Sequence, residues 1–540
     1  MKQFFLPRLV LLMSIFSFSF HLSSCGSSGN SGTTADTTTS AVVPADVVVS
    51  SPTASTSVSA SLGVKTLKAV GDAATEDYDA KKTALQNLIS GDNDCAFTLQ
   101  IPSVSSPSCY GPPVNFNGHL NSSAIDGDTN DDGQADDDGA LPSGDTGIWN
   151  TTQGVSEACA AAKMNELVQK VSANVDNMIN IAAVMACSGK KAGTTLPTIG
   201  ATVDLASTVE SQSTVSGLTV SSATLARKAN VDANSDGTTD PVYVSTLGVS
   251  MDFGGAIGVR TGTITLKHIP TTSDNSTYKG KLSFSMAKSS EDGGNCAGTA
   301  GTESGAVNAG TILYEKTSGT SLTYETNFAE FCGSSTDPFD TDNNIDPSDK
   351  VSTSNTDGWG NNWNYGLFAL NPSNGTGTFA YAWQAGQGDG NTRVLDVTTS
   401  IDSSDNLSGT AYFGFGTDIA TAAGRGTITA MICNWAGPGN THTGLEKAQR
   451  QVMSKASGTD TWISSSANIT YAPSNSCDAG IGDGFIYEAV NSGTYAAVAG
   501  TSGSELNFDN DRETDAAAVT NNLVNLTDVV FTAPTAPTDI

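Results

Sequence analysis

The chain has 540 residues and is strongly acidic, with 25 lysines and arginines against 55 aspartates and glutamates and a formal net charge of −30 at pH 7. This balance argues against nucleic acid as a partner, because a phosphate backbone is bound by basic patches. It argues equally against an anionic membrane surface as an electrostatic partner, and it is compatible with an exported protein and with calcium.

The first 24 residues have the features of an export signal. Lys2 and Arg8 supply positive charge at the start, and the apolar stretch 9–20 follows. This stretch is too short to span a bilayer and has the length of the hydrophobic region of a signal peptide. We therefore expect residues 1–24 to direct the chain out of the cytoplasm.

The export signal ends in a short motif at residues 22–25, which read LSSC. The motif resembles the lipobox of bacterial lipoproteins. The resemblance implies that Cys25 is lipidated and becomes the mature N-terminus, so that the membrane is a partner through this anchor. Because Gly26 and not aspartate follows the cysteine, it further implies the outer membrane. The alternative is a plain secretory signal with an incidental cysteine.

Residues 25–60 are expected to form a flexible tether. They consist mainly of serine, threonine, glycine, alanine and valine, without aromatic residues. Such a segment cannot bury enough apolar surface to offset the entropy lost on ordering. The remaining chain is long enough for two or three domains. We expect a helical domain over 61–200, an all-β domain over 201–515 and a C-terminal tail over 516–540.

Two segments of the predicted helical domain have helical patterns. Residues 62–89 are rich in alanine, lysine, leucine and glutamine and contain no proline. In residues 155–186, apolar residues recur at steps of three and four, which corresponds to one face of an α-helix. The length of this second segment favours a break at residues 172–174.

The second half of the chain has the pattern of β-strands. Short alternating runs, separated by Gly, Asn, Asp and Ser, predict an antiparallel sheet with one buried face. Residues 374–375 (Asn-Gly) indicate a hairpin turn. The fold class is therefore α+β, a small helical N-terminal domain followed by a mainly antiparallel β domain, as a sandwich or barrel-like structure. The strand runs lie at residues 262–266, 282–286, 377–383, 409–415, 426–432 and 447–455, and for the last of these a helix is the alternative.

The chain has nine cysteines, and eight remain when Cys25 is set aside. An even number in an exported chain without a C-x-x-C motif favours disulfides over a zinc or redox site. Many connectivities are possible, so the sequence does not determine the pairing. Short loops close most readily, which favours the sequential pairs 95–109, 159–187, 296–332 and 433–477.

Two loops repeat a spacing of oxygen-bearing side chains. Residues 128–136 read DTNDDGQAD and residues 232–240 read DANSDGTTD; both resemble the start of an EF-hand or dockerin-type calcium loop. Gly139 and Tyr243 stand where the bidentate glutamate belongs, so weak structural sites are expected. The alternative is a pair of Asp/Asn/Gly turns without metal. The ligands implied are Asp128, Asn130, Asp132, Gln134 and Asp136, and Asp232, Asn234, Asp236, Thr238 and Asp240.

An aromatic cluster offers a second candidate binding site. Trp359, Trp363 and Tyr365 lie in the polar stretch DGWGNNWNYG. Exposed Trp and Tyr side chains can stack on the sugar rings of a glycan or anchor a protein partner. The alternative is that these rings cover a sheet edge or fill the core.

No catalytic residue is assigned from the sequence. The mature chain has His119, His268 and His442, which are far apart, and it lacks the common hydrolase, metalloprotease and nucleotide-binding motifs. The sequence favours a non-enzymatic surface protein, with a binding or structural role and an ectodomain stabilised by calcium and disulfides. The alternative is an anchored extracellular hydrolase that acts on a polymer such as a glycan.

Overall fold

The structure is a computed structural model, and the residues that it describes belong to one compact unit, 36–540, distinct from residues 1–35. Among these residues, no helix is both long enough and apolar enough to cross a membrane. The described residues are 39–50, 73–91, 94–101, 109–110, 115–118, 149–150, 159–254, 258–288, 306–332, 362–384, 392–403, 406–416, 445–448, 451–455, 462–464, 471–473, 483–488, 495–497, 506–507 and 531–540.

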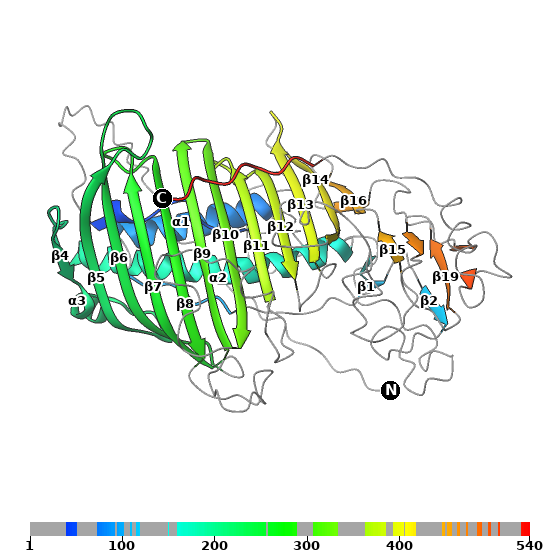
Figure 1. The fold of residues 1–540 in the computed structure, drawn as a ribbon, viewed down its shortest axis with the longest axis horizontal. Coiled ribbons are helices and arrows are strands. Elements are labelled where there is room, and N and C mark those ends of the chain that lie inside the picture. Colours follow the sequence, from blue (N-terminus) through cyan, green and yellow to red (C-terminus); the bar gives the residue numbers. More distant parts are fainter. Residues whose placement is uncertain are drawn as a thin grey trace, which may run out of the picture. The chain divides into compact units, whose positions relative to one another are not determined.

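A 13-stranded sheet dominates the fold (Figure 1). Each strand pairs antiparallel with the next along the chain, except that β15 is skipped between β14 and β16. The strands are β4 (Thr202–Asp204), β5 (Leu218–Val231), β6 (Asp240–Asp252), β7 (Val259–Pro270), β8 (Tyr278–Lys288), β9 (Ala306–Ser318), β10 (Ser321–Cys332), β11 (Asn362–Leu370), β12 (Gly377–Gln384), β13 (Thr392–Ile401), β14 (Leu407–Gly416), β16 (Gln451–Lys455) and β17 (Trp462–Ser464).

Helices and minor strands complete the described structure. The helices are η1 (Thr39–Val42), α1 (Ala73–Ser90), α2 (Cys159–Lys191) and α3 (Ala206–Gln212). The minor strands are β1 (Cys109–Tyr110), which pairs with β3 (Trp149–Asn150), β15 (Leu445–Ala448), which pairs with β18 (Tyr471–Pro473), and β19 (Asp483–Glu488), which pairs with β2 (Asn115–Gly118), β20 (Tyr495–Ala497) and β21 (Leu506–Asn507).

From β7 to β10 the sheet has one largely buried and one largely polar face, because its sequence alternates, whereas in β11 neighbouring residues such as Leu367 and Phe368 are both buried. On β7, Ile264 and Leu266 are buried, while Thr265 between them is in register with Ser283 of β8, which in turn pairs with Thr311 of β9. Helices α1 and α2 cross the strands on the buried side, and their apolar residues join the sheet in one hydrophobic cluster (Figure 1). This arrangement is the one expected when an antiparallel sheet has one face against a core and the other in water.

A short segment, residues 39–50, which begins with the 3-10 helix η1, lies inside this core. Val42, Val43, Val47 and Val49 are fully buried in the same cluster as the helices and the sheet. We call residues 39–50 the strap. The sequence predicts a flexible tether up to residue 60, but the structure buries the strap. Its valines supply the apolar surface that the rest of the tether lacks.

The C-terminal residues 531–540 cross the sheet on the side opposite the helices (Figure 1). Pro537 is buried, and the neighbours three positions away on each side, Pro534 and Ile540, are half-buried. Burial at every third residue is typical of a polyproline II segment. The segment is held by an ion pair between Asp539 Oδ1 and Lys281 Nζ of β8, 3.0 Å apart.

Several expectations from the sequence are confirmed. A helix-plus-β mixture with a mostly antiparallel sheet is present, and α2 includes most of the predicted periodic segment. The predicted runs at 262–266, 282–286, 377–383 and 409–415 lie in β7, β8, β12 and β14, and both described parts of 447–455 are extended. The Asn-Gly turn joins β11 to β12, with Gly375 at a φ of 72°, which glycine adopts at low cost. The run at 426–432 lies outside the described residues.

One expectation is wrong: helix α2 continues through 172–174 without a break. The side chains of Ser172 and Asn174 form hydrogen bonds with Gln100 and Asn308, which lie outside the helix. Among the described residues, the helices and the sheet share one hydrophobic cluster, and the main sheet runs from β4 to β17 with a helical layer against one face.

The disulfide also differs from the expected pairing. Cys95 is bonded to Cys187, so neither 95–109 nor 159–187 forms. The bond ties the extended segment 94–101 to the C-terminal part of α2. Spatial proximity in the folded core decides the pairing, and the sequence distance that governs loop closure in the unfolded chain does not. The other predicted pairs fall wholly or partly outside the described residues.

Candidate functional site

The structure describes one of the two predicted calcium loops. Cys25 and the loop 128–136 lie outside the described residues, whereas residues 232–239 connect β5 to β6. In this connection the Asp232 carboxylate accepts hydrogen bonds from the backbone N–H groups of Asp236 and Gly237, both at 3.0 Å. The Asp236 carboxylate accepts from Thr238, which lowers the pKa of Asp236.

The last residue of the predicted ligand set, Asp240, is also described. Asp240 is buried at the start of β6 and accepts from the N–H of Ala233 at 3.2 Å. Across the described part of the chain, no group of three or more His, Cys, Asp or Glu side chains is placed to hold a metal ion. The Asp232 and Asp236 carboxylates thus accept hydrogen bonds from within the loop itself, as in Asx turns.

The predicted aromatic cluster is described in part. Trp359 lies outside the described residues, and Trp363 is described as part of the β11 backbone, in register with Ala329 of β10. Tyr365 is buried, and its hydroxyl donates to Glu325 Oε2 at 3.4 Å. Tyr365 is thus a buried residue of an interior strand of the sheet.

His268 is fully buried on the helix side of β7. Its Nδ1 lies 2.8 Å from the Tyr314 hydroxyl, and its Nε2 lies 2.8 Å from Asn275 Oδ1. Tyr314 reaches the imidazole across Gly280 of β8, where an added Cβ would lie 2.0 Å from the tyrosine hydroxyl oxygen. Burial lowers the pKa of His268 to about 4, and the hydrogen bond to Asn275 opposes this shift. Both ring nitrogens are committed to the core.

We expect His268 to make the protein sensitive to acid. Its pKa is about 4 in the fold against 6.5 for the free side chain, so below pH 6.5 the unfolded state takes up the proton first. The free energy of unfolding therefore decreases as the pH is lowered, by up to about 3 kcal/mol between pH 6.5 and pH 4. Urea unfolding of the wild type and of His268→Gln across this range measures the effect. Parallel pH profiles of the two proteins would contradict it.

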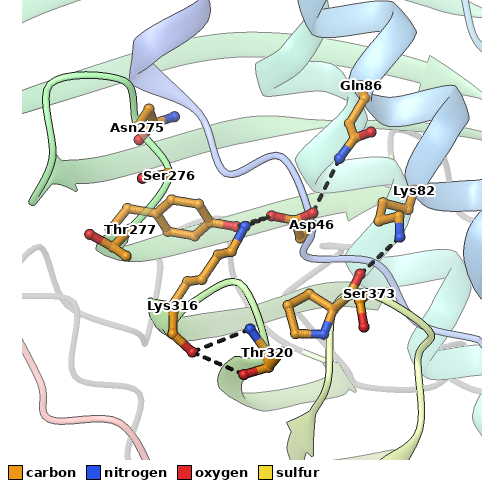
Figure 2. A network of polar contacts seen from close by, with 12 residues as sticks. Asp46, Lys82, Gln86, Asn275, Ser276, Thr277, Lys316, Thr320 and Ser373 are labelled. Carbon is orange, nitrogen blue, oxygen red and sulfur yellow. Dashed lines mark hydrogen bonds and ion pairs between the residues drawn. The ribbon is translucent and has the colours of Figure 1, made fainter.

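Asp46 of the strap is at the centre of a buried polar network (Figure 2). Its carboxylate forms an ion pair with Lys316 of β9 and accepts from Gln86 of α1 at 3.2 Å and from the Tyr278 hydroxyl at 3.3 Å. Burial, and then the charge of Asp46, raise the pKa of Tyr278 well above its usual value. The network joins the strap to the helix layer and to the sheet.

A second, partly buried ion pair holds the other end of the strap. Lys81 Nζ of α1 lies 3.2 Å from Asp176 Oδ2 of α2 and 2.5 Å from the carbonyl oxygen of Val49. Asp176 Oδ1 accepts from the Val49 N–H at 2.9 Å. The strap thus satisfies backbone groups through side chains of its neighbours, since it pairs with no strand of the main sheet.

A cavity of about 550 Å³ opens beside this second pair. Its walls are α1, the extended segment 94–101 and α2, and Val48 of the strap contributes to its lining. Phe97 supplies an aromatic wall, and Asn87 and Asn180 project from the two helices. Of the features described here, the cavity is the one with the volume and mixed lining of a small-molecule site.

The sequence-based search does not identify these residues. Lys81, Asp176 and Asp46 have no motif, and each acts through partners that are distant in the chain. A signal does exist for two of them. Asp46 interrupts a run of valines in VVPADVVV, and Asp176 follows the apolar Val175 in the middle of a periodic helix. A charged residue in an apolar segment predicts a buried partner.

Comparison with protein-family profiles, with curated protein sequences and with solved structures gave no match. The fold and the site therefore rest on the residues themselves.

Proposed function

We propose that this protein is a lipid-anchored exported protein of the outer membrane whose folded part is a non-enzymatic binding or structural body. The observation that carries the proposal is the coincidence of an export signal with the lipobox-like LSSC motif at Cys25. The Cys95–Cys187 disulfide supports it, because such bonds persist in oxidising compartments outside the cytoplasm.

The strap supports a short connection to the membrane. The strap begins at Thr39, and the stretch from Cys25 to Thr39 can extend over at most about 50 Å, at about 3.3–3.6 Å per residue. The lipid anchor would therefore hold the sheet and helices close to the membrane surface. The buried Asp46 and Lys81 contacts would carry any force from the anchor into the core.

The buried titratable groups support a structural role. His268, Asp46 and Asp176 are each engaged by neighbouring side chains, and the two aspartates hold the strap. Catalytic acids and bases need access to a substrate atom. The alternative, an anchored hydrolase of a polymer such as a glycan, has no specific support among the described residues.

The anchor is tested by Cys25→Ser. In the native host, the wild type should incorporate radiolabelled palmitate and partition into the detergent phase of a Triton X-114 extract. The variant should do neither and should appear in the aqueous phase, because it has no thiol to acylate. Ser24→Ala, next to the cysteine, is the matched control and should stay lipidated. Label on the Cys25→Ser protein would contradict the proposal.

Calcium remains part of the proposal through the repeated loop pattern. With dissociation constants of about 10⁻⁴–10⁻³ M, 5 mM calcium should stabilise the protein by about 1–2 kcal/mol for one site. The melting temperature should rise with calcium and fall with EDTA. The double variants Asp128→Asn/Asp132→Asn and Asp232→Asn/Asp236→Asn identify the responsible loop. A melting temperature that neither reagent changes would exclude both loops.

A further inference from the structure

The cavity between α1 and the segment 94–101 has a rigid frame. The Cys95–Cys187 disulfide fastens one end of the segment to α2. Farther along, the Gln100 N–H donates to Asn177 Oδ1 at 2.9 Å, and the Asn177 carboxamide donates to the Gln100 carbonyl at 2.8 Å. Because both ends of this wall are attached to α2, the cavity is built before any ligand arrives.

The charged pair in the cavity is already neutralised. Lys81 directs its donors to Asp176 Oδ2, to the Ser172 hydroxyl and to the Val49 carbonyl. Asp176, which is 2% exposed, also accepts from the Gln100 carboxamide at 3.2 Å. A charged ligand would find no uncompensated charge here, and in a chain of net charge −30 an anion would also meet general repulsion.

The cavity instead presents neutral hydrogen-bonding groups and an aromatic wall. None of the hydrogen bonds of the described residues engages the carboxamides of Asn87 and Asn180 or the hydroxyl of Thr98. Each carboxamide offers both donors and an acceptor. Phe97 and Ala84 provide the apolar surface beside them.

We propose that this cavity binds a neutral saccharide of one or two rings. A sugar ring has hydroxyl groups that both donate and accept, which suits carboxamides and a hydroxyl, and it has an apolar face that suits the Phe97 ring. The volume of about 550 Å³ accommodates a ligand of this size. The proposal names a ligand class for the binding role proposed above, on which it rests.

The test uses the full-length protein in a polyoxyethylene detergent, which has no sugar headgroup to compete. Isothermal calorimetry and saturation-transfer NMR are run with glucose, galactose, mannose, N-acetylglucosamine, maltose and cellobiose, and with glucuronate and glucosamine as charged comparators. We expect at least one neutral sugar to bind with a millimolar or lower Kd, at least tenfold more tightly than either charged sugar.

Variants locate the binding in the cavity. Asn180→Leu and Asn87→Leu should each raise the Kd at least tenfold, whereas Thr83→Leu, on the exposed surface of α1 outside the cavity, should change it less than twofold. Asn87 is exposed, so its variant tests the site even if Asn180→Leu fails to fold.

Two results overturn the saccharide proposal: no neutral sugar of the panel binds below about 10 mM, a weak limit for specific recognition, or Asn87→Leu binds as tightly as the wild type. Failure of the anchor proposal is separate, because lipidation of Cys25 does not enter the binding measurement. Cys25→Ser should bind the same sugar as the wild type.

Discussion

Asp46→Ala is expected to destabilise the protein by about 3–5 kcal/mol. Removing the carboxylate leaves Lys316, whose side chain is 12% exposed, without its counter-charge. It also removes the acceptor for Gln86 and for the Tyr278 hydroxyl. Urea unfolding followed by circular dichroism measures the loss. The strap should be released first, since Asp46 joins it to both the helix layer and the sheet.

An ion pair on helix α1, between Lys82 and Asp79, is the control for the Asp46 variant. Lys82 and Asp79 of α1 are 3.0 Å apart, and the Asp79 side chain is 53% exposed. Asp79→Ala should cost less than about 1 kcal/mol, because water screens the exposed Asp79 and because Lys82, which is 14% exposed, keeps its hydrogen bond to the Pro372 carbonyl. If Asp46→Ala proves as mild as Asp79→Ala, the Asp46 network does not hold the strap.

A double replacement separates charge from packing. Asp46→Leu combined with Lys316→Met removes both charges and restores apolar volume. Hydrophobic replacement of a complete buried pair is often neutral, so the double variant should recover most of the stability lost in Asp46→Ala. If the double variant is less stable than Asp46→Ala, the ion pair stabilises the fold by more than the neutralisation of its own two buried charges.

Local patterns predicted the elements of this fold, and non-local pairing explains what was missed. The alternation that places His268 on the same side of β7 as Ile264 and Leu266 is visible in the sequence and predicts a buried histidine. It does not show that Tyr314 would meet that histidine across Gly280. Register between strands depends on turns and core contacts that a single strand does not reveal.

The strap shows how composition can mislead over a short window. Residues 25–60 are polar on average, and that average predicts a tether. Within them, Val42, Val43 and residues 47–49 form a short apolar stretch that is buried in the core. The residues that surround this stretch are far away in the chain; one is Tyr324, whose hydroxyl donates to the Val48 carbonyl. When a segment packs against residues that are distant in the sequence, the only local sign of its burial is its own apolar residues.

Removal of the Cys95–Cys187 disulfide is the second large effect that we expect. The two cysteines are 92 residues apart, and closing a loop of this length in the unfolded chain corresponds to about 4–5 kcal/mol in the chain-entropy description. Both side chains are fully buried. Alanine is therefore the better replacement in the double variant Cys95→Ala/Cys187→Ala, because serine at these two positions would bury hydroxyl groups without partners. The double variant should unfold at a markedly lower urea concentration than the wild type.

Non-reducing digestion and mass spectrometry provide the independent check of connectivity. The wild type should yield a peptide pair that joins Cys95 to Cys187, and recovery of Cys187 bonded to Cys159 would contradict the structure and restore the sequential pairing.

Removal of the disulfide should also affect the cavity. Because the bond attaches segment 94–101 to α2, the Cys95→Ala/Cys187→Ala protein should lose affinity for any ligand of that cavity under conditions in which it remains folded. Stability and binding are then coupled through one covalent link, which connects the wall of the site to the longest helix of the core.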